Sequence, residues 1–312
     1  MNGLIVCAIL AGILYFCIYN WAFIYLYFGV ISIYFILSWV RIPASAKRFN
    51  GPRKKIQIST WSDPSRPTII AYFKVRLTKT LPFLERVSQK TGQKITLIHL
   101  LTKSIATAFK DHQDFNQKIV FGNFSQLKSL SASKVVSFDN DEDVYFIDIK
   151  DIDQKSLTTI ANEMQSKEES LIQGTDNKKY KESCAIFGKI PTCLGGVALE
   201  IIGFLTSALG FSLPSLGLKA YPFGNFIVSD MSMLKTEVIY APLIPMTRNP
   251  FSFTLTHVHD EVIAENSDIH IEKVVNICCS LDHRFADGIR LIKVQNIIQK
   301  YMENPDEFIV VE

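Results

Sequence analysis

The pattern of hydrophobic and polar residues divides the chain into two unlike parts. Residues 1–40 carry no charged side chain and are dense in aliphatic and aromatic residues. From Arg66 onward, apolar residues alternate with polar ones, in places with the period of a strand and in places with that of a helix. The pattern predicts an apolar N-terminal anchor followed by a mixed globular domain at about residues 66–312.

The N-terminal apolar stretch is too long for one straight membrane helix. Forty helical residues extend about 60 Å, roughly twice the hydrocarbon thickness of a bilayer. Asn20 offers a polar break near the middle. We therefore expect a transmembrane helical hairpin with helices at about 3–19 and 21–40, and a single span with an interfacial partner is the alternative. A cleaved signal peptide ending at Ala44-Ser45-Ala46 is disfavoured, because the apolar run far exceeds an h-region.

Basic residues follow the anchor without an intervening acid. They are Arg41, Lys47, Arg48, Arg53, Lys54 and Lys55. Juxtamembrane cations stay preferentially on the cytoplasmic or matrix side. Residues 1–55 are thus expected to form an integral membrane anchor with a basic juxtamembrane segment, and the catalytic domain is expected on the cytoplasmic or matrix side of an unidentified membrane.

The globular part mixes helices and strands. Thr96 precedes a strongly periodic apolar stretch and is a plausible helix N-cap. Expected strands are Thr68–Leu77, Val135–Phe138, Val144–Ile149, Phe253–His257 and Ile269–Leu281, and expected helices are Leu81–Lys90, Leu97–Lys110, one opened by Asp153–Leu157 and one from Ile289 to Pro305.

A second apolar segment interrupts the domain at about residues 184–218. Its central part, Leu194 to Leu213, carries one charge, Glu200, which a spanning helix would bury at a cost of about 2.5–3.5 kcal/mol. Four glycines further weaken a long rigid span. An interfacial or re-entrant helical pair is expected, lying on the bilayer or lining an entrance for an acyl chain. An extra core helix is an equally open alternative.

The candidate chemistry lies near the C-terminus. An apolar run from Val274 to Leu281 is followed by Asp282-His283-Arg284-Phe285-Ala286-Asp287-Gly288 and then by a helical pattern. This order predicts a strand, a tight turn and a helix. A histidine so placed can accept a proton near neutral pH, and Asp287 can hold the turn. A solvated turn with incidental charges is the alternative for an isolated HxxxDG.

The longer motif, DHRxxDG with an amphipathic helix and Glu303-Asn304-Pro305 behind it, resembles the C-terminal signature of the 2-oxoacid dehydrogenase acyltransferases. That family shares its fold with chloramphenicol acetyltransferase. The resemblance implies an α+β, chloramphenicol acetyltransferase-like mixed sheet flanked by helices. It also implies that His283 activates a thiol and that Asp287 fixes the turn, while Arg284 is expected to be structural.

The stretch Phe223–Ser232 resembles the family's strand that ends in Ser-Asn-Leu-Gly, whose first serine stabilises the oxyanion. Ser229 falls on that position. Asp230 and Ser232 replace the usual asparagine and glycine, so the turn is expected to differ. In the family, the catalytic histidine and serine come from neighbouring subunits, and the resemblance therefore implies a homotrimer.

Together these features predict a membrane-anchored acyltransferase that uses coenzyme A and acyl thioesters, with lipid-like acyl groups as candidate substrates. The residues that bind coenzyme A are not assigned, and neither a bound lipoyl group nor a metal site is expected. A formal charge of +3 gives no reason to expect a nucleic-acid partner. The alternative function is a catalytically inactive scaffold subunit of a membrane complex, which the altered turn at Asp230 and Ser232 favours and the joint presence of His283, Asp287 and Ser229 disfavours.

Overall fold

A computed structural model describes residues 8, 11–16, 22–40, 68–138, 143–173 and 192–309. The first described helix of any length is α2 (Ala22–Val40), which coincides with the second half of the expected hairpin. The first half, at about 3–19, and the basic segment 41–55 lie mostly or wholly outside the described residues. No helix in the described ranges combines the length and apolarity of a membrane span. The expected transmembrane hairpin is therefore not shown.

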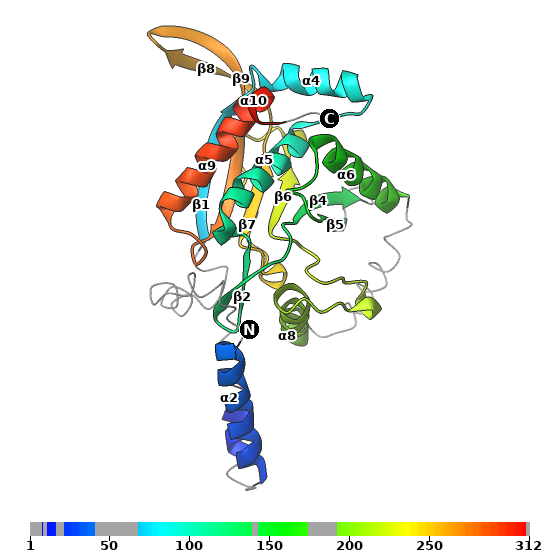
Figure 1. Ribbon diagram of the computed structural model, residues 1–312, viewed down its shortest axis with the longest axis vertical. Helices are drawn as coiled ribbons and strands as arrows, with labels where there is room; N and C mark the ends of the chain where they lie inside the picture. Colours follow the sequence, from blue (N-terminus) through cyan, green and yellow to red (C-terminus); the bar gives the residue numbers. More distant parts are fainter. Residues whose placement is uncertain are drawn as a thin grey trace.

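The domain is built on one mixed sheet (Figure 1). Within the described residues, its strand order is β1-β9-β7-β6-β4-β5, with β8 pairing the outer half of β9. The parallel pairs are β4 with β6 and β6 with β7, and the other pairs are antiparallel. The strands are β1 (Thr68–Arg76), β4 (Ala132–Phe138), β5 (Asp143–Ile149), β6 (Phe226–Asp230), β7 (Phe251–Leu255), β8 (His259–Glu265) and β9 (Asp268–Asp282).

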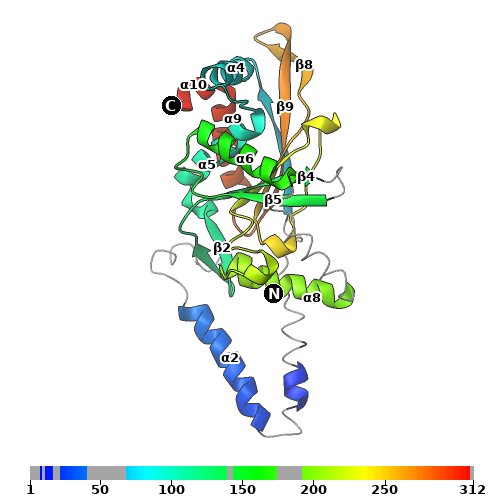
Figure 2. The ribbon, with the colours of Figure 1, turned by 90° about the vertical axis from the view of Figure 1, so that its right-hand side faces the viewer.

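Helices cover one face of this sheet, as Figure 2 shows from the side. They are α4 (Thr80–Thr91), α5 (Leu97–Asp111), α6 (Leu157–Ile172), α9 (Gly288–Glu303) and α10 (Pro305–Phe308). Phe109 of α5 lies at the centre of the core, with its ring centroid 5.4 Å from that of Phe226 and 5.1 Å from that of Phe251. Burial of these aromatic side chains holds α5 against the middle strands.

The opposite face of the sheet has no helix among the described residues. Ile70 and Tyr72 of β1 point to it and are 59% and 53% exposed, whereas Phe73 and Val75 point to the helices and are buried. Alternation along a strand explains this difference, because successive side chains point to opposite faces. The loop around Glu237 covers part of this face, and the Nδ2 of Asn276 donates to the Glu237 carbonyl oxygen at 2.9 Å.

The expected α+β class and most of the expected elements are confirmed. Thr96 is the N-cap of α5, in extended conformation as a cap requires. Residues 139–142, which join β4 to β5, lie outside the described residues. β8 was not predicted from the sequence. Neither was the small hairpin formed by β2 (Gln117–Val120) and β3 (Asn123–Gln126), whose four-residue strands are too short to show a period.

The apolar insert forms α8 (Thr192–Gly203), a π-helical turn η3 (Phe204–Ala208) and a short connection to β6. It is not a core helix: Leu199 and Ile201 are 38% and 51% exposed, and among the side chains of the insert that the structure describes, the first buried one is Thr206. The C-terminal end of α8 packs on the 3₁₀ turn η6 (Pro245–Thr247), where a Cβ on Gly203 would collide with the Met246 carbonyl oxygen. Glycine at position 203 thus permits this close approach.

Candidate active site

His283 lies in the turn that joins β9 to α9. β9 ends at Asp282, and the backbone N–H of Phe285 donates to the Asp282 carbonyl oxygen at 3.0 Å. Asp287 is the N-cap of α9, and its Oδ1 accepts from the backbone N–H of Arg290 at 3.4 Å. The strand, the turn and the helix expected from the sequence are all present. Asp287 therefore holds the start of α9 four residues after the histidine.

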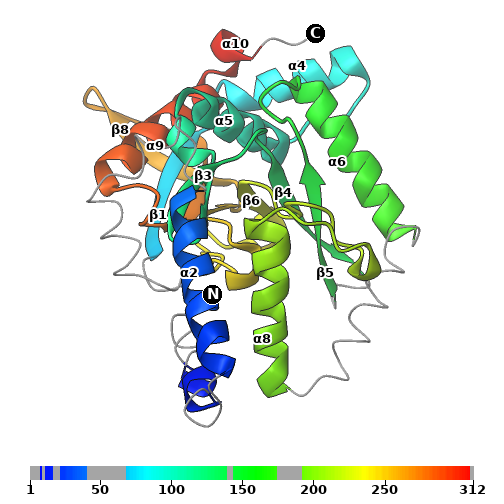
Figure 3. The ribbon, with the colours of Figure 1, turned by 60° about the horizontal axis from the view of Figure 1, so that its bottom comes forward.

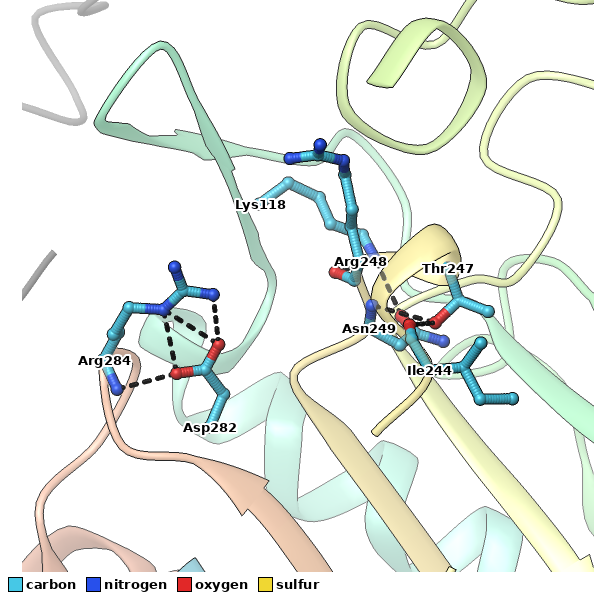
Figure 4. A network of polar contacts seen from close by, with 7 residues as sticks. All are labelled: Lys118, Ile244, Thr247, Arg248, Asn249, Asp282 and Arg284. Atoms are coloured by element: carbon cyan, nitrogen blue, oxygen red, sulfur yellow. Dashed lines mark hydrogen bonds and ion pairs between the residues drawn. The ribbon is translucent and has the colours of Figure 1, made fainter. Parts of the chain in front are cut away.

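The residues on either side of His283 are tied to each other. The Nη2 of Arg284 lies 2.6 Å from Oδ2 of Asp282, and its Nε lies 3.0 Å from both carboxylate oxygens (Figure 4). The backbone N–H of Arg284 also donates to Oδ1 of Asp282 at 2.9 Å. Both residues are buried. A bidentate, buried pair across the turn restricts its backbone and thereby fixes the position of His283.

A second buried network supports the strand beside this turn. The backbone N–H of Asp282 donates to the Pro250 carbonyl oxygen at 2.8 Å. Asn249 precedes that proline and accepts on Oδ1 from the Nζ of Lys118, at 2.6 Å, while its Nδ2 donates to the Phe223 carbonyl oxygen. Lys118 is 2% exposed, and burial lowers its pKa to about 7, with Arg248 adding in the same direction. Hydrogen bonds of Asn249 thus connect β2 to the segments that lead into β6 and β7, next to the His283 turn.

Arg248 connects this network to the apolar insert. Its backbone is in the left-handed region, with φ of 50°, and its guanidinium lies 5.4 Å from the centroid of the Phe204 ring. Burial lowers the pKa of Arg248, and the carboxylate of Glu200 acts in the opposite direction. Because Arg248 is two residues from Pro250, the insert lies at the same end of the sheet as His283.

Ser229 occupies the helix-free face of the sheet. It is 2% exposed and pairs with Thr254 of β7, which in turn pairs with Cys278 of β9 and, through it, with Tyr72 of β1. Paired residues of neighbouring strands point to the same face. The serine hydroxyl is therefore one end of a polar row that crosses four strands.

The strand register separates Ser229 from His283 within one chain. Ser229 is level with Cys278, whereas the turn begins after Asp282, four residues further along β9. Four extended residues span about 13 Å, and two strand spacings add about 10 Å across the sheet. Groups that act on one carbonyl need to lie within about 3 Å of the reacting atoms. One chain alone thus does not bring the two side chains to one acyl group.

Asp230 and Ser232 stand where the family has asparagine and glycine after the serine, and in this structure they are hydrogen-bonded to each other. Oδ1 of Asp230 accepts from the backbone N–H of Ser232 at 3.1 Å and from its hydroxyl at 2.6 Å. This is the Asx-type bonding that aspartate favours in turns. The turn that replaces Ser-Asn-Leu-Gly is therefore closed by its own side chains.

The remaining strand histidines are engaged in local contacts. Nδ1 of His257 lies 3.2 Å from the Ser232 carbonyl oxygen, and Nε2 of His270 lies 2.6 Å from Oε1 of Glu272. In the ranges that the structure describes, no group of three or more His, Cys, Asp or Glu side chains is arranged to hold a metal ion. His99, which the sequence analysis did not single out, is buried at the start of α5, and burial lowers its pKa to about 4.

Comparison with protein families identifies the class. The catalytic domain of the 2-oxoacid dehydrogenases acyltransferase family matches residues 46–181 and 216–310. The chain belongs to this family and is an enzyme of the acyltransferase class, as the C-terminal motif led us to expect. The unmatched residues 182–215 fall on the apolar insert.

Individual relatives are more distant. The chain is 25% identical, over 178 residues, to the dihydrolipoyllysine-residue acetyltransferase component of the pyruvate dehydrogenase complex of Rhizobium meliloti (strain 1021). That match covers 52% of this chain and 38% of the relative, so the chain spans well under half of that protein.

Solved structures share the fold. A probable dihydrolipoamide acetyltransferase from Listeria monocytogenes superposes with a TM-score of 0.59 at 16% identity, covering 87% of this chain and 97% of that one. The cubic core of the pyruvate dehydrogenase multienzyme complex gives 0.57 at 14% identity, covering 90% and 89%. The mixed sheet with helices on one face is thus the fold of these acetyltransferases.

Proposed function

We propose that the chain is a coenzyme A-dependent acyltransferase in which His283 is the general base. The observation that carries this proposal is the turn between β9 and α9, where the buried Asp282–Arg284 pair and the Asp287 cap fix a histidine at the end of a strand. Rigid support for one titratable side chain is what general base catalysis requires.

In the proposed reaction, neutral His283 removes the proton from the coenzyme A thiol as the sulfur attacks the acyl thioester carbonyl. A new carbon–sulfur bond forms and a tetrahedral oxyanion develops. The Ser229 hydroxyl donates a hydrogen bond to that oxyanion. Collapse of the intermediate breaks the original carbon–sulfur bond, and the departing thiolate takes the proton back from His283.

In this proposal the two side chains come from different copies of the chain, and the strand register supports this because it separates them within one copy. The exposed Ile70 and Tyr72 on the helix-free face support assembly, since large apolar side chains on a sheet face mark contact surfaces. One solved relative is itself the core of a multienzyme complex. A homotrimer, in which each site uses His283 of one copy and Ser229 of the next, agrees with these features.

Mixing two inactive variants tests this arrangement. His283→Ala removes the base, an effect typically worth 10²- to 10⁴-fold in rate, and Ser229→Ala removes an oxyanion donor worth about 10²- to 10³-fold. Mixed assemblies of the two variants contain some sites with both wild-type residues, so acyl exchange should partly return. His270→Ala is the matched control, because His270 is exposed near the distal end of β9.

Two results would count against the proposal. Full acyl exchange by homogeneous His283→Ala protein would remove the histidine from the chemistry. Wild-type protein that is inactive with short, medium and long acyl thioesters would instead favour the scaffold function. Failure of mixed assemblies to recover activity would contradict only the shared site.

We also propose that the N-terminal region attaches the enzyme to a membrane. α2 contains no charged residue, and its side chains are apolar or uncharged on all sides. Tyr25 and Phe28 are 82% and 61% exposed. The six cations of residues 41–55 favour the cytoplasmic or matrix side for the catalytic domain. Removing residues 1–55 should release the protein from membranes with its acyl exchange intact, and sedimentation with lipid measures this.

The position of the insert supports lipid-like acyl groups as substrates. α8 and η3 lie at the His283 end of the sheet, where an acyl chain gains about 0.8 kcal/mol for each methylene buried. Medium or long acyl thioesters should therefore react better than acetyl. Replacing the half-buried Leu205 and Leu209 with serine should reduce this preference more than it reduces acetyl transfer. Equal loss for both substrates would assign the insert to packing.

A further inference from the structure

The apolar helices α2 and α8 lie at the same end of the molecule. Figure 2 shows α8 lying across the base of the domain with α2 extending away below it, and Figure 3, which brings the base forward, shows both helices at this end. The tip of the β8–β9 hairpin is at the opposite end in Figures 1 and 2. Two apolar segments about 160 residues apart in the sequence thus lie at one end of the molecule.

We call the apolar surface at this end the base surface. Its exposed large apolar side chains are Tyr25, Leu26, Phe28, Val30, Ile33, Tyr34 and Ile36 of α2, Leu199 and Ile201 of α8, and Phe211.

A row of ring contacts joins the two helices to the catalytic domain. The ring of Tyr34 in α2 meets that of Phe121 edge-on, with centroids 6.1 Å apart. Phe121, in the turn between β2 and β3, meets Phe204 of η3 at 5.3 Å, and the Arg248 guanidinium lies 5.4 Å from the centroid of the Phe204 ring. The same β2–β3 turn therefore contacts both α2 and the segment that continues α8.

The length of α8 determines how it can meet lipid. Twelve helical residues extend about 18 Å, well short of the roughly 30 Å of a hydrocarbon core, so α8 cannot span. Glu200 would also oppose deep burial. A short apolar helix with one charged residue, which lies across the base of a domain, is suited to the interface between headgroups and acyl chains.

We infer that α8 is a second membrane contact, which lies in the interface of an anionic bilayer and orients the His283 end of the domain toward the lipid. This inference rests on the membrane attachment in the proposed function and adds to it a defined orientation. A bilayer suits the base surface better than a protein partner does, because α2 is uncharged on every side and six cations follow it. The loop with Phe211 contacts the same lipid surface.

Tryptophan probes in the full chain test this contact. Ile201→Trp and Phe211→Trp place an indole on the base surface at exposed positions, and Phe211→Trp exchanges one aromatic ring for another. Ile269→Trp is the matched control, since Ile269 is 75% exposed on the β8–β9 hairpin at the far end. Each variant is reconstituted in vesicles of anionic lipid that carry bromine on the upper part of the acyl chains, and the fluorescence added over that of the parent chain is measured.

The expected result is that bromolipid quenches the added fluorescence of Ile201→Trp and Phe211→Trp but not that of Ile269→Trp. If bromolipid quenches the tryptophans of the parent chain but not the fluorescence added at Ile201 and Phe211, the α8 contact is wrong. The proposed membrane attachment would remain supported in that case. A parent chain whose own tryptophans are not quenched would overturn both. Acyl exchange with a soluble thioester, measured in parallel, reports on the proposed reaction independently of either result.

Discussion

Arg284 and Asp282 form a buried ion pair across the single residue His283, with Nη2 and Oδ2 2.6 Å apart. The side chain of Asp282 is 1% exposed and that of Arg284 is 9% exposed. The pair links the last residue of β9 to the turn, so the rigidity of the sheet extends to the histidine. Removing either partner would leave the other charge buried without compensation.

Arg284→Met should therefore destabilise the domain by about 3–5 kcal/mol, because the Asp282 carboxylate would lose its partner. Thermal or denaturant unfolding measures the loss. Arg86→Met is the control, since the Arg86–Asp306 pair is exposed and such pairs contribute no more than about 1 kcal/mol. Equal stability of the two variants would show that the Asp282–Arg284 pair does not support the turn.

His99 should make the domain sensitive to mild acid. Its Nδ1 accepts from the backbone N–H of Thr96 at 3.1 Å, and burial lowers its pKa from 6.5 to about 4, with Lys134 adding to the shift and Asp230 opposing it. Between these values the unfolded chain binds more protons than the folded one, so stability falls as pH falls, by up to about 3 kcal/mol.

Glutamine at position 99 keeps an acceptor for the cap but does not titrate. Unfolding of His99→Gln should depend less on pH between 6.5 and 4 than unfolding of the wild type. An unchanged pH dependence would mean that other groups account for the acid sensitivity.

Lys118 should make the stability of the domain depend on pH in the alkaline range. Burial lowers its pKa from 10.5 to about 7, so between these values the unfolded chain again binds more protons. Stability should rise as pH increases across this range, by several kcal/mol. Lys118→Met keeps the apolar stem and should remove the rise. Lys79→Met, at an exposed lysine bonded to Asn304, should retain it. The free energy of unfolding is measured as a function of pH for both variants, and the same pH dependence in both would contradict the prediction.

Two glycines of α8 provide a matched pair. Alanine at Gly203 would place its Cβ against the Met246 backbone, whereas alanine at Gly196 would meet no atom within 4 Å. Gly203→Ala should cost about 1–3 kcal/mol by overpacking and loosen the insert. Gly196→Ala should be neutral or stabilising by up to about 1 kcal/mol, because alanine favours the helix. Unfolding midpoints and proteolysis within the insert measure both effects, and similar behaviour of the two would contradict the packing of α8 on η6.

The sequence by itself determined the elements with a clear period and the turn that holds His283. β1, α5, β9 and α9 each show an apolar repeat that depends only on neighbours along the chain. The turn at His283 was also predictable, because a buried strand, a polar cluster, a glycine and an amphipathic helix follow one another directly.

The tertiary structure decided what depends on contacts between distant segments. Strand register, which the local pattern does not encode, separates Ser229 from His283 within one chain. Packing of Gly203 on Met246 placed the insert at the His283 end and outside the core. Lys118 shows the same limit. Its position in a four-residue strand gives no sign of burial, and its hydrogen-bond partner Asn249 lies 131 residues away in the sequence. Periodicity is a local property, whereas burial, register and pKa depend on the side chains that the fold brings together.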